Sequence, residues 1–129
     1  MKKKMIAALM AGIILSGRIG AAYAAQLGDA LQQVGAATQA AWATGNPSEA
    51  LANAVPYMQA FGHMVLAWMW LDVACSVLEK DAGLSDVQNA GRMNAARYFF
   101  HYELPKIGAW LGVVKSRDMT CAAVSAEMF

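Results

Sequence analysis

The most continuous hydrophobic pattern in the chain runs from Tyr57 to Leu78. Apolar side chains recur along it at alternating steps of four and three residues, which places them on one face of an α-helix. They are Tyr57, Phe61, Met64, Trp68, Leu71, Cys75 and Leu78. Most of the remaining positions are apolar too, and a helix that is apolar nearly all round is buried on several sides. The pattern therefore predicts a central helix that other helices surround.

Further segments on both sides of this stretch also show helical spacing. Residues 26–43 combine an apolar stripe with polar positions between, which predicts an amphipathic helix. Asn46 is placed to cap the next helix and Pro47 suits its first position, while Pro56 either kinks that helix or divides it from the central one. Another apolar stripe continues across Pro105, which predicts one kinked helix. Its members are Met93, Ala96, Phe100, Leu104, Ile107, Leu111 and Val114.

Turn and capping residues separate these segments. Gly83 is free to take a left-handed conformation after the central helix, and Ser85 is a suitable N-cap for the next one. Asp118 is placed to cap a last short helix at the end of the chain. No segment shows the two-residue alternation of a β-strand. The predicted fold class is therefore all-α, a helical bundle of about four helices with kinks at Pro56 and Pro105.

Length and composition predict a single domain with some apolar residues on its surface. Its 129 residues are enough for one compact domain and too few for two. Charged residues make up only 15% of them and apolar residues 58%, so we expect some apolar area to face a partner, either a second copy or a larger assembly. The large side chains predicted for the core or such an interface are Trp42, Tyr57, Phe61, Trp68, Leu71, Phe100, Leu104 and Trp110.

The pattern of residues 1–24 differs from that of the rest of the chain. Met1–Lys4 is basic, residues 5–17 are apolar or small, and Ala22-Tyr23-Ala24 matches the A-x-A pattern of signal peptidase cleavage. This predicts a signal-peptide-like segment over 1–24, a helical domain over 25–129, and export to the periplasm. The apolar run is shorter than the roughly 20 residues that cross a bilayer, so an uncleaved membrane anchor is a less favoured alternative. A first amphipathic helix of a cytosolic protein is another.

The charge distribution argues against nucleic acid as a partner. The formal net charge is +1, but four of the ten basic residues lie within the first 18 positions, and the rest of the chain is mildly acidic. No basic stripe remains for a phosphate backbone. The glycines also form no phosphate-binding loop. Those inside predicted helices suggest close helix packing instead, and they are Gly62, Gly91, Gly108 and Gly112.

Candidate catalytic or metal-binding residues are few. His63 and His101 have no histidine or carboxylate four residues away on the same helix face, so structural roles are favoured and no metal site is predicted. Glu103 and Asp72 lie near the apolar stripes, but spacing places no acid, nucleophile or oxyanion donor beside them. For Asp72 we expect an ion pair with an arginine or a solvated position.

The two cysteines leave two possibilities open. Cys75 and Cys121 do not form a CxxC motif, so neither a redox centre nor a zinc knuckle is indicated. In an oxidising compartment they could form a disulfide between the central and last helices. In a reducing one Cys75 is a small core residue.

Two stretches resemble a known domain. The stretch AVPYMQAFGHMVLAWMWL over residues 54–71 and the stretch AARYFFHYELP over residues 95–105 are similar to two helices of the C-terminal helical domain of bacterial acyl-CoA dehydrogenases, the acetyl-CoA dehydrogenase-like C-terminal domain. The resemblance covers roughly residues 30–115. It implies an all-helical domain appended to an enzyme that oxidises acyl-CoA thioesters with FAD and a glutamate base, in the cytoplasm.

In the resembled family, FAD, the acyl-CoA and the base are held by preceding domains that this sequence does not contain. No catalytic or flavin-binding residue is carried over, and Glu103 does not match the family base. We therefore expect a stand-alone or truncated domain that is not an enzyme by itself, binds no cofactor, and packs against itself or an acyl-CoA dehydrogenase body. The alternatives are an accessory subunit of an FAD-dependent acyl-CoA dehydrogenase supplied in trans and an exported protein that binds a small apolar ligand.

Overall fold

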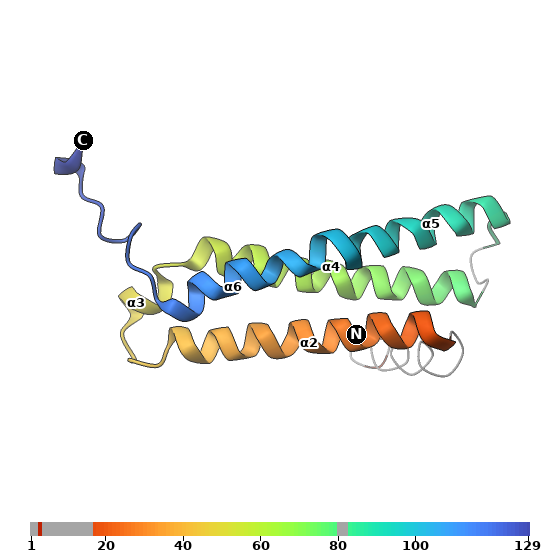
Figure 1. Cartoon of the computed structure of the whole chain (residues 1–129), viewed down its shortest axis with the longest axis horizontal. Coiled ribbons are helices and arrows are strands. Elements are labelled where there is room, and N and C mark those ends of the chain that lie inside the picture. The colour runs from red at the N-terminus through yellow and green to blue at the C-terminus, as the bar shows by residue number, and fades with distance from the viewer. Residues whose placement is uncertain (1–2, 4–16, 80–82) are drawn as a thin grey trace.

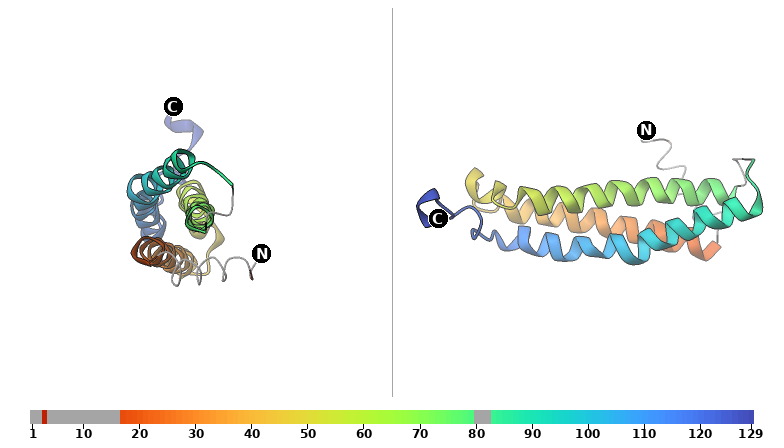
Figure 2. Two further views of the ribbon diagram at one scale, coloured as in Figure 1. Left: turned by 90° about the vertical axis from the view of Figure 1, so that its right-hand side faces the viewer. Right: turned by 90° about the horizontal axis from the view of Figure 1, so that it is seen from above.

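The computed structural model describes residues 3, 17–79 and 83–129, and three long helical rods form its body (Figure 1). The first rod is α2 (Gly17–Ala41) and the second is α4 (Ala54–Leu78). The third comprises α5 (Asp86–Tyr98), the π-helical turn η1 (Phe99–Glu103), the 3-10 turn η2 (Leu104–Lys106) and α6 (Ile107–Ser116). The short α3 (Pro47–Leu51) joins α2 to α4. The rods lie side by side (Figure 2), and every regular element of the described residues is helical, so the all-α prediction is confirmed.

The predicted caps position the helices. Asn46 Oδ1 accepts a hydrogen bond from the Ser48 N–H at 3.0 Å and so caps α3. At the start of α5, Ser85 Oγ accepts from the Gln88 N–H at 3.3 Å, and Gln88 Oε1 accepts from the Ser85 N–H at 2.9 Å. This reciprocal pair is a capping box. Gly83 has a φ of 60°, the left-handed conformation expected of it.

The chain changes direction just before Pro56. The helix α3 ends at Leu51, and α4 begins at Ala54 after a two-residue turn. Pro56 thus lies in the first turn of α4, where helical N–H groups have no partner within the helix and a missing N–H costs nothing. Of the two outcomes predicted at this proline, division into a short and a long helix is the one that occurs.

Pro105 is accommodated without ending the third rod. The Leu104 N–H donates to the Phe99 carbonyl, five residues back, and the Ile107 N–H donates to the Leu104 carbonyl, three residues back. A wide π turn therefore precedes the proline, and a tight 3-10 turn contains it. The two deviations offset one another, so Phe100, Leu104 and Ile107 are all buried, as the predicted stripe requires.

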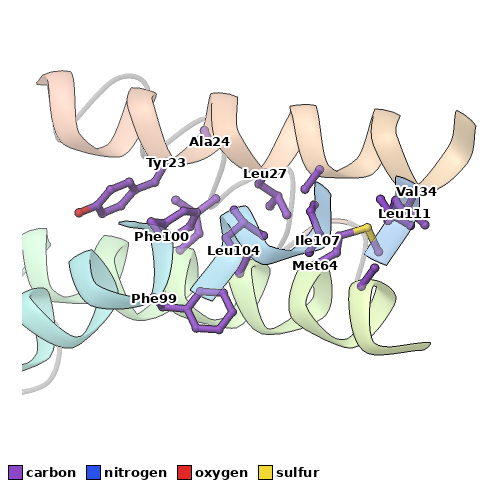
Figure 3. Close-up of a cluster of buried hydrophobic side chains, with 14 of the residues drawn as sticks. Tyr23, Ala24, Leu27, Val34, Met64, Phe99, Phe100, Leu104, Ile107 and Leu111 are labelled. Carbon is purple, nitrogen blue, oxygen red and sulfur yellow. The ribbon is translucent and has the colours of Figure 1, made fainter. Parts of the chain in front are cut away.

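The core lies where the three rods meet (Figure 3). On α2 the buried residues recur at steps of four and three, which is the seam of a left-handed bundle. They are Tyr23, Leu27, Ala30, Val34, Ala37 and Ala41. On α4 an alanine is buried at every seventh position, at Ala60, Ala67 and Ala74. These small side chains leave room for the larger residues of the third rod, above all Phe100 and Leu111.

The predicted boundary between residues 24 and 25 falls inside α2. Tyr23 and Ala24 are only 4% and 6% exposed, and the Tyr23 ring stacks on Phe100 with centroids 4.2 Å apart. Most of the predicted signal segment, residues 1–2 and 4–16, lies outside the described residues. Cleavage after Ala24 stays a prediction, and it would remove the Tyr23 ring from the bundle.

The prediction of a last short helix after Asp118 is wrong. The Thr120 N–H donates to Asp118 Oδ1 at 3.0 Å, but turns follow, and the only regular element is the 3-10 turn η3 (Ala126–Met128). All residues after Asp118 are exposed. A short helix without tertiary packing is unstable, because one turn of hydrogen bonds does not offset its nucleation cost. This tail extends away from the bundle (Figure 1).

Replacement of Phe100 by alanine tests the core. Phe100 is 1% exposed, whereas Phe61 on α4 is 39% exposed and serves as a matched control. Phe100→Ala is expected to lower the free energy of unfolding in urea by about 3–5 kcal/mol, because it opens a cavity beside Tyr23 and removes the stacked ring. Phe61→Ala is expected to cost about 1 kcal/mol or less. Equal losses for the two variants would contradict this packing.

Candidate functional site

The residues predicted for the core or an interface fall into three environments. Buried in the core are Leu71, Phe100 and Leu104. Partly buried against it are Tyr57, Trp68 and Trp110. Exposed at the surface are Trp42 and Phe61, at 46% and 39%.

The two cysteines differ in burial. Cys75 is buried in α4 and Cys121 is exposed in the tail, and the structure does not join them as a disulfide. Burial raises the pKa of the Cys75 thiol, which makes it a poor nucleophile.

A polar cluster that spacing did not predict lies beside the π turn. Glu103 accepts two hydrogen bonds from Lys106 Nζ, both at 2.8 Å, and one from the Tyr98 hydroxyl at 3.3 Å. His63 of α4 approaches it, with Nε2 3.4 Å from Glu103 Oε2 and Nδ1 3.1 Å from the Gln59 carbonyl. Both partners of the ring are acceptors, so a neutral His63 donates to only one of them. The cluster ties the π turn to α4.

This arrangement does not favour acid–base catalysis. The hydrogen bonds from Lys106 hold the pKa of Glu103 below its usual range, with His63 and Tyr98 contributing further. A carboxylate stabilised in its charged form is a weak base near neutral pH. The rings of His63 and Trp110 also form a T-shaped pair, with centroids 4.7 Å apart. The other histidine, His101, is exposed, and among the described residues no three His, Cys, Asp or Glu side chains converge as metal ligands would.

Surface hollows lie at several places in the described part of the chain. One of about 260 Å³ is formed where α2, α3 and α4 meet and is lined by Trp42, Leu51, Tyr57 and Met58 among others. Within it, Thr38 Oγ1 donates to the Val34 carbonyl at 2.8 Å and lies 2.9 Å from the Tyr57 hydroxyl. Two more, of about 160 and 410 Å³, lie along α2 near Pro105 and over the start of α4.

None of these hollows suits FAD, the cofactor of the family that the sequence resembles. Their linings contain no lysine or arginine to balance a pyrophosphate. Glycine-rich turns at a helix N-terminus, which commonly hold a dinucleotide, do not line them either. The residues that line these hollows therefore do not form a flavin-binding site.

The outward side of α4 is apolar and uncovered. It consists of Val55, Met58, Gly62, Leu66, Met69 and Val73, which we call the α4 outer face. Val55 is 72% exposed, Met58 and Met69 are each 59% exposed, and Leu66 is 43% exposed. The prediction that α4 is surrounded is therefore wrong, since α2 and the third rod cover only one side of it. By length and composition alone α4 is apolar enough to cross a membrane, a test that core helices of soluble proteins also pass.

The prediction missed this face, although a second apolar stripe in the sequence indicates it. From Val55 the apolar or small positions recur at steps of three and four through Met58, Gly62, Leu66 and Met69, opposite the buried stripe. No comparable sequence pattern indicates the His63–Glu103 contact, because the two residues lie 40 positions apart and meet only through the packing of two rods.

The polar cluster leads to a prediction of pH dependence. Because folding lowers the pKa of Glu103, its carboxylate stabilises the fold above the ordinary pKa of 4.5, and this contribution is lost as pH falls through the lowered value. Glu103→Gln is therefore expected to melt below the unsubstituted protein near neutral pH, and the difference is expected to vanish in acid. In a Lys106→Met background the difference in melting temperature near neutral pH should be smaller. A difference that is constant from neutral to acidic pH would contradict this role.

The comparisons with known proteins agree with this helical architecture. The family described as "Acetyl-CoA dehydrogenase C-terminal like" matches residues 3–125. No curated protein and no solved structure is significantly similar to the chain. Because the match spans nearly the whole chain, including all three rods, the chain belongs to the acetyl-CoA dehydrogenase C-terminal-like family.

Proposed function

We propose that this chain acts as a non-catalytic interaction module, with the α4 outer face as its contact surface. The observation that carries the proposal is the exposure of four large apolar side chains in one uncharged stripe on the most apolar helix. Single exposed apolar residues are common, but a contiguous apolar surface on a soluble domain usually marks an interaction site.

The chemistry of the described residues supports a role without catalysis. Glu103 is held in its charged form by Lys106, and the buried Cys75 thiol has a raised pKa. Neither is poised as a base or nucleophile. FAD and acyl-CoA chemistry would then come from an acyl-CoA dehydrogenase body, if such a body is the partner. A flavin absorbance in the purified chain, or dye reduction by it with an acyl-CoA, would contradict this part of the proposal.

A second candidate function is the binding of a small apolar ligand. The hollow beside Trp42 and Tyr57 favours it, because its lining is mainly apolar and the Thr38–Tyr57 hydroxyl pair lies within it. Thr38 already donates to a carbonyl, so Tyr57 donates to Thr38 and offers a ligand only its acceptor lone pairs. The volume of about 260 Å³ lies just below the common range for ligand pockets, roughly 300–1,000 Å³. We therefore favour the interaction role.

Site-specific photocrosslinking in intact cells tests the contact surface. A photoreactive amino acid in place of Met69 is expected to yield protein–protein adducts, because the α4 outer face is covered in the working protein. The same amino acid in place of Val87 is the control, since that side chain is 83% exposed and aliphatic but belongs to another helix, α5. Equal adduct yields at the two positions, or none at Met69, would overturn the proposed role.

A further inference from the structure

We propose that the α4 outer face pairs with the same face of a second copy of this chain, antiparallel, about a two-fold axis at the level of Met64. The inference rests on the proposed function, because it names the partner of the same surface. A two-fold interface brings one patch against itself, so each contact occurs twice. The patch must therefore be complementary to itself in shape and in charge.

The shape condition is met at the middle of the face. With the axis at Met64, Gly62 lies opposite the partner's Leu66, and Val55 lies opposite the partner's Val73. Leu66 is 43% exposed and can enter the notch that the glycine leaves. Such an arrangement is a knob in a hole, repeated on the other side of the axis.

The notch at Gly62 has no use within one chain. A Cβ added there would meet no atom within 4 Å, and the same is true of Gly91, Gly108 and Gly112. The prediction that these glycines let helices of this chain approach closely is therefore wrong. Glycine inside a helix is destabilising relative to alanine. At Gly62 a close approach by a second helix would offset that cost.

The charge condition is met at the ends of the face. The six residues of the face carry no charge, so its self-pairing buries none. Asp72 is exposed on one flank, and the antiparallel pairing places it beside the first turn of the partner's α4. That turn contains no acidic residue and no side-chain cap, because Asn53 instead donates its side-chain N–H to the Asp118 carbonyl at 2.8 Å.

A carboxylate near an uncapped helix N-terminus is stabilised by the unpaired N–H groups and the helix dipole. Of the two positions expected for Asp72, an ion pair with an arginine or a solvated site, the described residues show the solvated one, so its carboxylate is available for this contact. A parallel pairing would instead bring the two Asp72 side chains to the same level and leave both first turns uncapped. The charges therefore select the antiparallel arrangement.

Sedimentation equilibrium of the full chain tests the pairing. A dimer of about twice the 13.7 kDa chain mass is expected. Gly62→Leu is expected to raise the dimer dissociation constant about tenfold or more, because the added side chain fills the notch that receives Leu66. Gly91→Leu is the matched control, since it also adds a side chain in open space on a helix, and it should leave the dissociation constant unchanged. Both variants should keep their helical circular dichroism.

Disulfide formation tests the register. In a Cys121→Ser background, a mixture of Gly62→Cys and Leu66→Cys chains is expected to cross-link faster than either variant alone. Equal rates for the mixture and the separate variants would contradict an axis at Met64.

The outcomes separate this inference from the function on which it rests. A chain that stays monomeric at high concentration, while Met69 cross-links to a different protein in cells, overturns the self-pairing and leaves the interaction role standing. A chain that remains soluble only in detergent, and is monomeric there, also overturns it, because lipid then covers the face. A dimer that is weakened equally by Gly62→Leu and Gly91→Leu uses another surface and overturns it as well.

Discussion

The structure depends on one constraint: α4 is apolar on nearly every side, and a bundle of three rods covers only one side of it. The alanines at positions 60, 67 and 74 let α2 and the third rod approach α4 closely on the covered side. The opposite side keeps Val55, Met58, Leu66 and Met69 in contact with solvent. Burial of such side chains contributes roughly 25 cal/mol per Å² of apolar surface, so a partner that covers this face gains a large driving force. The fold thus leaves one side of its most apolar helix exposed, where a partner can bind.

The third rod shows how the covered side is completed despite a proline. Pro105 cannot donate the hydrogen bond that a regular helix requires, and a π turn followed by a 3-10 turn replaces it. This change of winding keeps Phe100 and Leu104 in the core, where the Tyr23 ring stacks on Phe100. It leaves Glu103 outside the core, where Lys106 and His63 bind it. The residues with the most obvious chemistry therefore serve to fix the rod to α4.

Local patterns predicted much of this arrangement, and features that depend on contact between distant segments could not be predicted. Asn46 and Ser85 act as caps because capping involves neighbours in sequence, and the stripe from Met93 to Val114 follows from helix periodicity alone. The His63–Glu103 contact joins rods that periodicity cannot orient about their axes. The prediction of a last helix was wrong for a related reason, because the residues after Asp118 are exposed and do not pack on the bundle. The apolar excess of α4 was evident in the sequence, but whether its own chain or a partner covers it depends on how many rods the chain supplies.

The family match shows what kind of domain this is, the acetyl-CoA dehydrogenase C-terminal-like kind, and its role is the one proposed above. The central claim is that the α4 outer face is covered in the working protein, and methionine oxidation measures this most directly. Met58 and Met69 are each 59% exposed in the isolated chain, and Met128 in the tail, at 66%, is an internal reference. On brief peroxide treatment of the natively assembled protein, Met58 and Met69 should oxidise severalfold more slowly than Met128, and they should match it when the protein is diluted until it dissociates. Oxidation of all three at the same rate in the native assembly would contradict the account.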